Sequence, residues 1–138
     1  MNLNPDLVRA RARDIEESLA RLEGIRQMSK DAFLADDDSR DLACYRLMVA
    51  IEAALALCYH VAARRLSKVP EEYAECFGNL GRAGIVPEDL ACRLQQMARF
   101  RNILVHIYWK IDYDKVYDIL QSNLEDLRLF SRSIVDLL

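Results

Sequence analysis

The chain has 138 residues, of which 52% are hydrophobic and 30% charged, and its net charge is −3. These values exclude a disordered chain and the strongly basic class of proteins that coat nucleic acids, although a local basic site stays compatible with them. They are ordinary for a globular protein, so we expect one domain over residues 1–138. The N-terminus does not look like a signal peptide and no apolar run approaches membrane-span length, which predicts a cytoplasmic protein without a membrane partner.

Metal and cofactor binding are not predicted. The four cysteines are far apart, form no C-x-x-C pair and are accompanied by only two histidines, so we expect buried, reduced thiols instead of a zinc site. Three consecutive aspartates, Asp36–Asp38, are a more specific candidate for a metal site, but the side chains of consecutive residues point in different directions. We interpret them as a capping connector between helices, and their position at the mouth of a cleft is left open.

The first two helices are indicated by capping residues and by apolar spacing. Asn4 before Pro5 starts a helix, and apolar residues at alternating steps of three and four continue it to about residues 28–33. A broad apolar stripe predicts the second helix over residues 42–66. Glu52 falls within this stripe, and a buried carboxylate needs a partner, so we expect it to pair with an arginine or a backbone donor. His60, on the same helix, is predicted to be partly exposed.

The rest of the chain predicts one short and two further long helices. Pro70 is expected at the first position of a short helix that ends at Gly81 and Gly84. The next helix starts at residues 85–89, and Asp112 caps the last one, which continues to Leu138. No segment alternates with the period of a strand. We therefore predict an all-α fold, an antiparallel bundle of four long helices and one short helix.

The candidate functional residues are concentrated in the run from residue 99 to residue 108. Arg101, Asn102, His106 and Tyr108 are separated there by apolar residues. A guanidinium holds a phosphate bidentately, an imidazole exchanges a proton at neutral pH, and an amide can orient either group. Together these groups suit metal-free phosphodiester chemistry. The alternative is that His106 is a histidine satisfied within the core and that Tyr108 is an aromatic residue at a helix end.

Helix geometry sets a condition on this site. At about 100° per residue, Asn102 and His106 lie on one face, whereas Arg101 and His106 are about 140° apart. They can act on one phosphate if the helix ends or distorts before His106, or if two chains each supply part of the site. We expect distortion and a homodimer together.

The run Arg101-Asn102-x-x-x-His106-x-Tyr108 resembles the R-x4-6-H motif of the HEPN ribonuclease superfamily, and its form Arg-Asn-x-x-Val-His-x-Tyr resembles the HepT toxins. The similarity covers about residues 5–135 and does not depart from the family at the motif positions. It includes further matching positions: Ile51–Ala54, Pro70 with Tyr73, Phe77 with Leu80, Gly84–Ile85, Leu90, Ile111–Asp112 and Val116–Tyr117.

The resemblance implies a HEPN-like bundle and a metal-independent endoribonuclease toxin. Arg101, Asn102 and His106 are then the catalytic residues, with Glu52 and Arg99 in supporting positions. The nucleophile is the 2′-OH of the RNA, a tRNA or an mRNA. The resemblance also implies an MNT-type nucleotidyltransferase antitoxin as partner, which silences the toxin by transferring AMP to Tyr108.

Two other functions stay open at this point. The first is a non-catalytic HEPN module that binds a nucleotidyltransferase or a nucleotide without cutting RNA. The second is a helical assembly protein in which the motif is accidental. The intact pair of Arg101 and His106 favours the ribonuclease.

Overall fold

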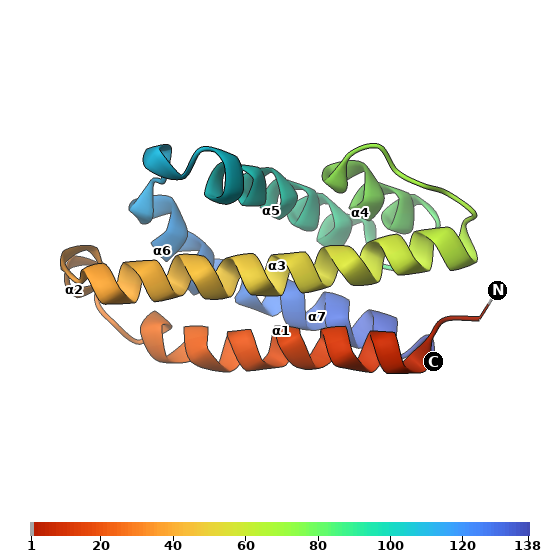
Figure 1. The fold of residues 1–138 in the computed structure, drawn as a ribbon, viewed down its shortest axis with the longest axis horizontal. Coiled ribbons are helices and arrows are strands. Elements are labelled where there is room, and N and C mark those ends of the chain that lie inside the picture. Colours follow the sequence, from red (N-terminus) through yellow and green to blue (C-terminus); the bar gives the residue numbers. More distant parts are fainter. Residues whose placement is uncertain (1) are drawn as a thin grey trace.

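The computed structural model describes residues 2–138, apart from the side chain of Tyr108. Every regular element in this part of the chain is helical, and neighbouring long helices run antiparallel (Figure 1), which confirms the predicted all-α bundle. The elements are α1 (Pro5–Arg26), α2 (Lys30–Ala35), α3 (Asp37–Arg65), α4 (Tyr73–Arg82), α5 (Glu88–His106), the 3₁₀ helix η1 (Tyr108–Lys110), α6 (Tyr113–Ser122) and α7 (Leu124–Val135).

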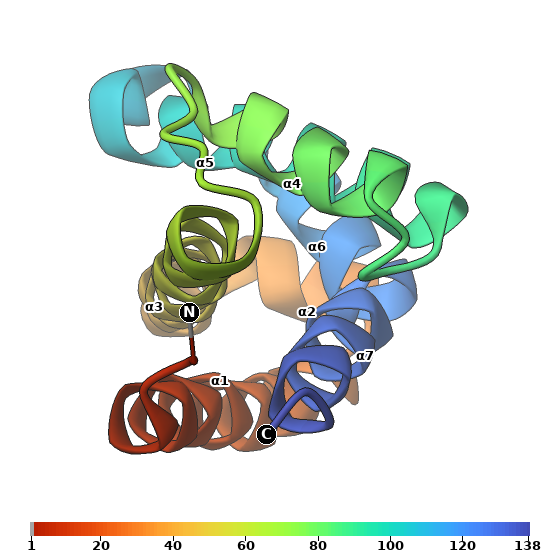
Figure 2. The same ribbon diagram turned by 90° about the vertical axis from the view of Figure 1, so that its right-hand side faces the viewer.

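Helix α3 is the central element of the bundle. It lies between α1 and the α4–α5 pair (Figure 1), and the view along the bundle shows α1, α3, α5 and α7 arranged around a common core (Figure 2). Each helix from α1 to α7 contributes at least one large, fully buried side chain to this core. Examples are Leu19, Phe33, Leu47, Phe77, Leu94, Leu120 and Phe130. Apolar burial of this kind supplies the main driving force for the fold.

The predicted caps are present. The Asn4 side chain accepts hydrogen bonds from the backbone N–H groups of the first turn of α1, and Asp112 does the same for α6. Asp36 accepts from the hydroxyl of Ser39, which lowers the pKa of its carboxyl group, and also from the N–H of Asp38. The aspartate run is therefore a helix start, as predicted, but α3 begins at Asp37, five residues earlier than expected.

Further boundaries differ from the prediction, and two of them have a local reason. The first helix ends at Arg26, because Ser29 caps a separate short helix by accepting from the N–H of Ala32 at 3.2 Å. The last helix is divided at Asn123, whose side chain donates to Asp126 at 3.0 Å. Pro70 is not at the first position of the short helix, which begins only at Tyr73.

One further expectation needs correction. Helix α3 is long and apolar enough, by length and composition alone, to cross a membrane, although no such segment was expected from the sequence. Half of its most apolar window is buried inside the bundle. A core helix of a globular protein has the same length and composition, so the observation is weak evidence for a membrane span.

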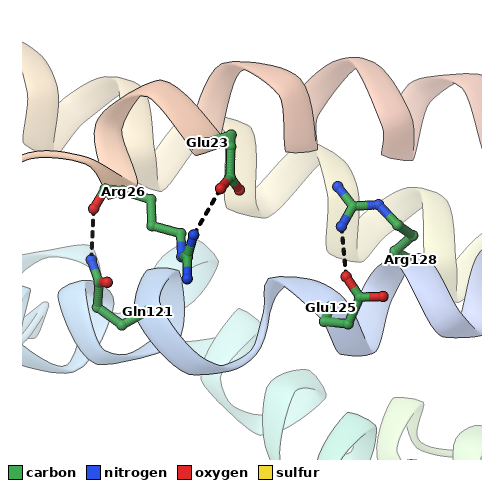
Figure 3. A network of polar contacts seen from close by, with 5 residues as sticks. All are labelled: Glu23, Arg26, Gln121, Glu125 and Arg128. Atoms are coloured by element: carbon green, nitrogen blue, oxygen red, sulfur yellow. Dashed lines mark hydrogen bonds and ion pairs between the residues drawn. The ribbon is translucent and has the colours of Figure 1, made fainter.

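A polar contact fixes the end of α1 to α6, and ion pairs within α1 and within α7 lie beside it (Figure 3). The side chain of Gln121 donates to the carbonyl oxygen of Arg26 at 2.9 Å, and Arg26 itself pairs with Glu23 at 2.8 Å. On α7, Arg128 pairs with Glu125 at 2.6 Å (Figure 3). The Gln121 contact satisfies a carbonyl group at the end of α1 and holds that helix against α6.

Helices α4 and α5 form a close antiparallel pair, and this pair positions the site. A Cβ atom on Gly81 would lie only 2.6 Å from the Cβ atom of Ala91, so glycine allows the two backbones to approach. Gly84 turns the chain between them with φ +76°. At the other end of the pair, the side chain of Gln95 donates to the carbonyl oxygen of Ala74 at 3.0 Å. The start of α4 is thereby held beside the middle of α5.

Candidate functional site

An open groove of about 630 Å³ lies between the start of α4 and the C-terminal end of α5. Its α5 wall contains three of the predicted site residues, Arg99, Asn102 and His106. They are spaced three and four residues apart, which places them on one face of the helix. All three are exposed. The structure therefore brings together a guanidinium, an amide and an imidazole on one accessible surface.

The opposite wall of the groove comes from the start of α4 and contains Glu71, Glu72, Tyr73 and Ala74. The two carboxylates face a wall that carries Arg99, so the charges of the groove are mixed and not uniformly basic. Glu75 accepts a hydrogen bond from the backbone N–H of Glu71 at 3.1 Å, which fixes the segment before α4.

Arg101 lies behind this surface instead of on it. The residue is only 8% exposed, and it is absent from the residues that line the groove. Its Nε donates to a carboxylate oxygen of Glu52, and its Nη1 donates to the side-chain oxygen of Asn102 at 3.1 Å. Its Cζ atom lies 4.6 Å from the centroid of the Tyr73 ring. The guanidinium is thus held by a charge, an amide and an aromatic face.

The expected partner of Glu52 is present, and it is Arg101 itself. The two residues are 49 positions apart in the sequence and join α3 to α5. The Glu52 side chain is 44% exposed, so its carboxylate is less buried than the apolar stripe suggested. An ion pair with one partly hydrated partner contributes modestly to stability. Its main consequence is to restrict where the Arg101 guanidinium can lie.

The predicted distortion before His106 is wrong. Helix α5 continues through His106 and ends there, with Ile107 leaving the helical conformation at φ −130° and ψ 43°. Because the helix is regular from Arg101 to His106, the two side chains leave it about 140° apart. Within one chain, Asn102 connects them: it bonds to Arg101 and shares the groove with His106.

Tyr108 lies at the start of η1, directly after the turn that ends α5. Its side chain is outside the described part of the structure, so its role stays a prediction. The neighbouring Trp109 is 68% exposed, and Ile103 and Ile107 are each 37% exposed. An apolar surface therefore borders the groove at the end of α5.

The sequence did not identify Tyr73 as a site residue. Its spacing with Phe77 and Leu80 fits the apolar face of a short helix, which by itself indicates a packing role. The available signal was Pro70-x-x-Tyr73, a position shared with the family that the chain resembles. Its contact with Arg101 depends on how α4 packs against α5, which no local pattern in the sequence specifies.

Other candidates from the sequence lie away from the groove. Asp36–Asp38 are at the start of α3 and do not line it. The Nε2 atom of His60 accepts a hydrogen bond from the N–H of Asn4 at 2.9 Å, and burial lowers its pKa. Cys58 and Cys76 are free and buried, as expected, and burial raises the pKa of the half-buried Cys44 to about 11, whereas Cys92 is exposed. Among the described residues, no group of three or more His, Cys, Asp or Glu side chains could hold a metal ion.

Comparison with known proteins decides the family. The sequence profile of the Ribonuclease HepT-like family matches residues 15–134, most of the chain. The chain belongs to the Ribonuclease HepT-like family. Two HepT-like relatives are similar in sequence: the mRNA nuclease HepT of Shewanella oneidensis, 26% identical over 71% of this chain and 74% of that protein, and the tRNA nuclease HepT of Aphanizomenon flos-aquae, 26% identical over 96% of this chain and 90% of that protein.

Solved structures share the HepT-like fold. The tri-AMPylated HEPN toxin of Shewanella oneidensis, in complex with its MNT antitoxin, superposes with a TM-score of 0.86 at 24% identity, over 97% of this chain and 98% of that one. A toxin–antitoxin complex with AMP-PNP contains a chain with a TM-score of 0.83 and 24% identity, over 97% and 99% of the two chains. At these identities the likeness shows that the helical architecture is the same.

Proposed function

We propose that the protein is a metal-independent endoribonuclease toxin that acts at the groove between α4 and α5. The observation that carries the proposal is the shared surface of Arg99, Asn102 and His106, with the Arg101 guanidinium directly behind it. Both curated relatives are named as nucleases of RNA. A tRNA or an mRNA is therefore the substrate class.

The proposed reaction uses the nucleophile that RNA carries itself. The 2′-OH attacks the adjacent phosphorus, the bond to the 5′-oxygen breaks, and a 2′,3′-cyclic phosphate remains. His106 takes the proton of the 2′-OH or gives a proton to the leaving 5′-oxygen. Arg101 stabilises the charge that grows on the phosphate in the transition state, and Asn102 orients Arg101. Arg99 supports binding as an exposed cation on the groove wall.

We propose a homodimer as the active form. One histidine can hardly act as base and acid in the same step, and Arg101 and His106 leave α5 in different directions. A second copy that covers the apolar surface of Ile103 and Ile107 brings two grooves together across a two-fold axis. The exposed apolar area beside the groove supports this choice of surface.

The dimer is tested by a charge placed on this surface. Ile103→Glu is expected to convert the sedimenting species from dimer to monomer and to remove cleavage. Leu129→Glu is the matched control, because Leu129 is also an exposed apolar helix residue, at 41%, but on α7. A wild-type protein that sediments as a monomer at micromolar concentration and still cleaves RNA contradicts the paired site.

We further propose that an MNT-type nucleotidyltransferase silences the protein by modifying Tyr108. The transfer moves AMP from ATP to the phenol oxygen and releases pyrophosphate. AMP at this position, two residues from His106, adds bulk and negative charge where the RNA phosphate must bind. The HEPN toxin of Shewanella oneidensis is AMPylated and bound to such an antitoxin, which supports the proposal.

Intact mass spectrometry tests the modification. Co-expression with the partner is expected to add one or more AMP masses to the wild-type chain and to reduce its toxicity. Tyr108→Phe is expected to stay toxic and to lose the added mass at this residue. An unmodified wild-type chain that is nevertheless silenced contradicts this control mechanism.

The nuclease is tested by incubating the purified protein with tRNA and mRNA in the presence of EDTA. Wild type is expected to cut the RNA, and His106→Ala to leave it intact although it still binds. RNA that binds but stays uncut by the wild type favours the alternative, a non-catalytic module that binds a nucleotidyltransferase or a nucleotide. The mixed charge of the groove and the ion pair on Arg101 are the observations that keep this second candidate worth testing.

A further inference from the structure

Tyr73 contacts Arg101 through its aromatic ring. Among the described residues that line the groove, Asn102 contacts the Arg101 guanidinium through a hydrogen bond and Tyr73 contacts it through its ring face. The Tyr73 ring therefore belongs both to the groove wall and to the surroundings of the buried cation. It is 36% exposed, so part of it is accessible from the groove.

The ring itself is held from α3. Tyr59 packs edge-on against Tyr73, with ring centroids 5.9 Å apart and an interplanar angle of 87°. Edge-to-face contacts of this geometry are favourable. Glu52, which pairs with Arg101, lies seven residues before Tyr59 and so on the same side of α3. Helix α3 thus supports both the cation and the ring that contacts it.

An aromatic face has a property that suits this place. It attracts a guanidinium through its quadrupole, but it carries no net charge that would neutralise the cation. A second carboxylate would compete with an RNA phosphate for Arg101, and an aliphatic side chain would not attract the cation. The Tyr73 ring can therefore orient Arg101 behind the groove wall without adding a second negative charge to that of Glu52.

We infer that Tyr73 is a positioning residue for RNA cleavage, whose ring holds the Arg101 guanidinium where it can contact the scissile phosphate. This inference rests on the proposed ribonuclease function and adds a residue to it. It predicts that the aromatic ring matters and that the hydroxyl group does not. It also predicts an effect on the chemical step, because a displaced guanidinium loses its interaction with the transition state.

The test compares Tyr73→Leu with Tyr73→Phe in cleavage kinetics. Tyr73→Leu is expected to lower kcat roughly 10-fold to 100-fold, because small displacements of positioning groups have effects of this order, and to change KM little. Tyr73→Phe is expected to stay within about threefold of wild type, because the ring face is preserved. Tyr73→Gln serves as a second non-aromatic variant if the leucine variant is insoluble.

The matched control is Tyr113→Leu. Arg40 lies over the Tyr113 ring at 4.9 Å, so this variant removes a similar contact at a place that does not line the groove. It is expected to change stability but not kcat. The inference is overturned if Tyr73→Leu keeps the kcat of the wild type, or if Tyr73→Phe loses as much kcat as Tyr73→Leu. Either result leaves the proposed function intact. A wild-type protein that cuts no RNA overturns both.

Discussion

Among the described residues, two arginine–tyrosine ring contacts join different helices, and they show how the same kind of contact can serve structure in one place and function in another. Arg101 lies 4.6 Å from the Tyr73 ring and pairs with Glu52. Arg40 lies 4.9 Å from the Tyr113 ring and pairs with Asp37. Each cation is therefore held by an aromatic face and a carboxylate, with similar geometry.

The difference lies in the remaining donors and in the neighbours. Arg40 also donates to the carbonyl oxygen of Leu34, so its guanidinium closes the corner between α2 and α3. Arg101 donates instead to the side chain of Asn102, which can move and which lines the groove with His106. Contact geometry alone therefore does not indicate function. What matters is whether the surrounding groups face an accessible surface with complementary chemistry.

The largest expected effect comes from removing each arginine in turn. Arg101→Ala is expected to lower kcat roughly 10²-fold to 10³-fold, the usual effect of losing a donor that stabilises transition-state charge. Arg40→Ala is expected to leave kcat within about twofold and to lower the free energy of unfolding by about 1–2 kcal/mol, because it removes a partly buried hydrogen-bonding group. Single-turnover cleavage and urea denaturation measure the two quantities. Equal kinetic losses in both variants contradict the distinction.

The packing of α4 against α5 holds Tyr73 in place, so disturbing it gives the next effect. Gly81→Ala places a Cβ atom 2.6 Å from that of Ala91, and is expected to lower the free energy of unfolding by about 1–3 kcal/mol and to reduce cleavage. Gly24→Ala is the control, because nothing lies within 4 Å of its new Cβ atom. Because Gly24 lies in the last turn of α1 without a positive φ, alanine is expected to stabilise by about 0.4–1 kcal/mol, with unchanged kcat. Thermal and urea unfolding of both variants check this.

The two carboxylates that pair with these arginines are expected to differ in their effect on cleavage. Glu52→Gln is expected to free the Arg101 charge for phosphate but to loosen its position, so that KM and kcat both fall a few-fold. Its effect on stability is expected to stay below about 1 kcal/mol, because Glu52 is partly hydrated. Asp37→Asn, at the other pair, is expected to change neither kinetic constant. Steady-state kinetics over a range of RNA concentrations distinguishes these results, and an unchanged Glu52→Gln enzyme would count against the assigned role of the ion pair.

The smallest effect concerns His60, at the end of α3 that is remote from Arg40. Burial and the nearby Arg64 lower its pKa below the ordinary value of 6.5, so the folded state favours the neutral imidazole that accepts from Asn4. The stability that this provides is present above pH 6.5 and is lost as the pH falls below it. Between about pH 7.5 and pH 5.5, the wild-type melting temperature is expected to fall about 1–2 °C more than that of His60→Gln, whose amide oxygen can accept in both conditions. Parallel pH profiles contradict this assignment.

Features that depend on nearby residues could be predicted from the sequence. Asn4, Asp36 and Asp112 cap helices because their side chains reach backbone N–H groups only two or three residues away. The pairing of Glu52 was also predictable, since a carboxylate in an apolar stripe needs a partner. The break at Asn123 was not, because no proline or glycine interrupts the apolar spacing there.

The sequence predicted which residues of α5 gather at the site, but not how their side chains are arranged there. Helical spacing places Asn102 and His106 together, and the groove contains both. The position of Arg101 behind that surface, and its contact with Tyr73, depend on the packing of three helices that are distant in sequence. Local spacing has no information about such packing. The regular course of α5 through His106 was missed for another reason: the expected distortion followed from the need to bring Arg101 and His106 to one phosphate, although no proline or glycine lies between them.

The chemistry is tested most directly by one substitution in the RNA. The cut position in a defined oligonucleotide is first mapped with the wild-type protein, and the nucleotide on its 5′ side is then replaced by its 2′-deoxy form. If Arg101 and His106 promote attack by the 2′-OH, the modified oligonucleotide stays uncut in EDTA, while the unmodified one ends in a 2′,3′-cyclic phosphate. Cleavage of both oligonucleotides at the same position and rate would contradict the proposed mechanism.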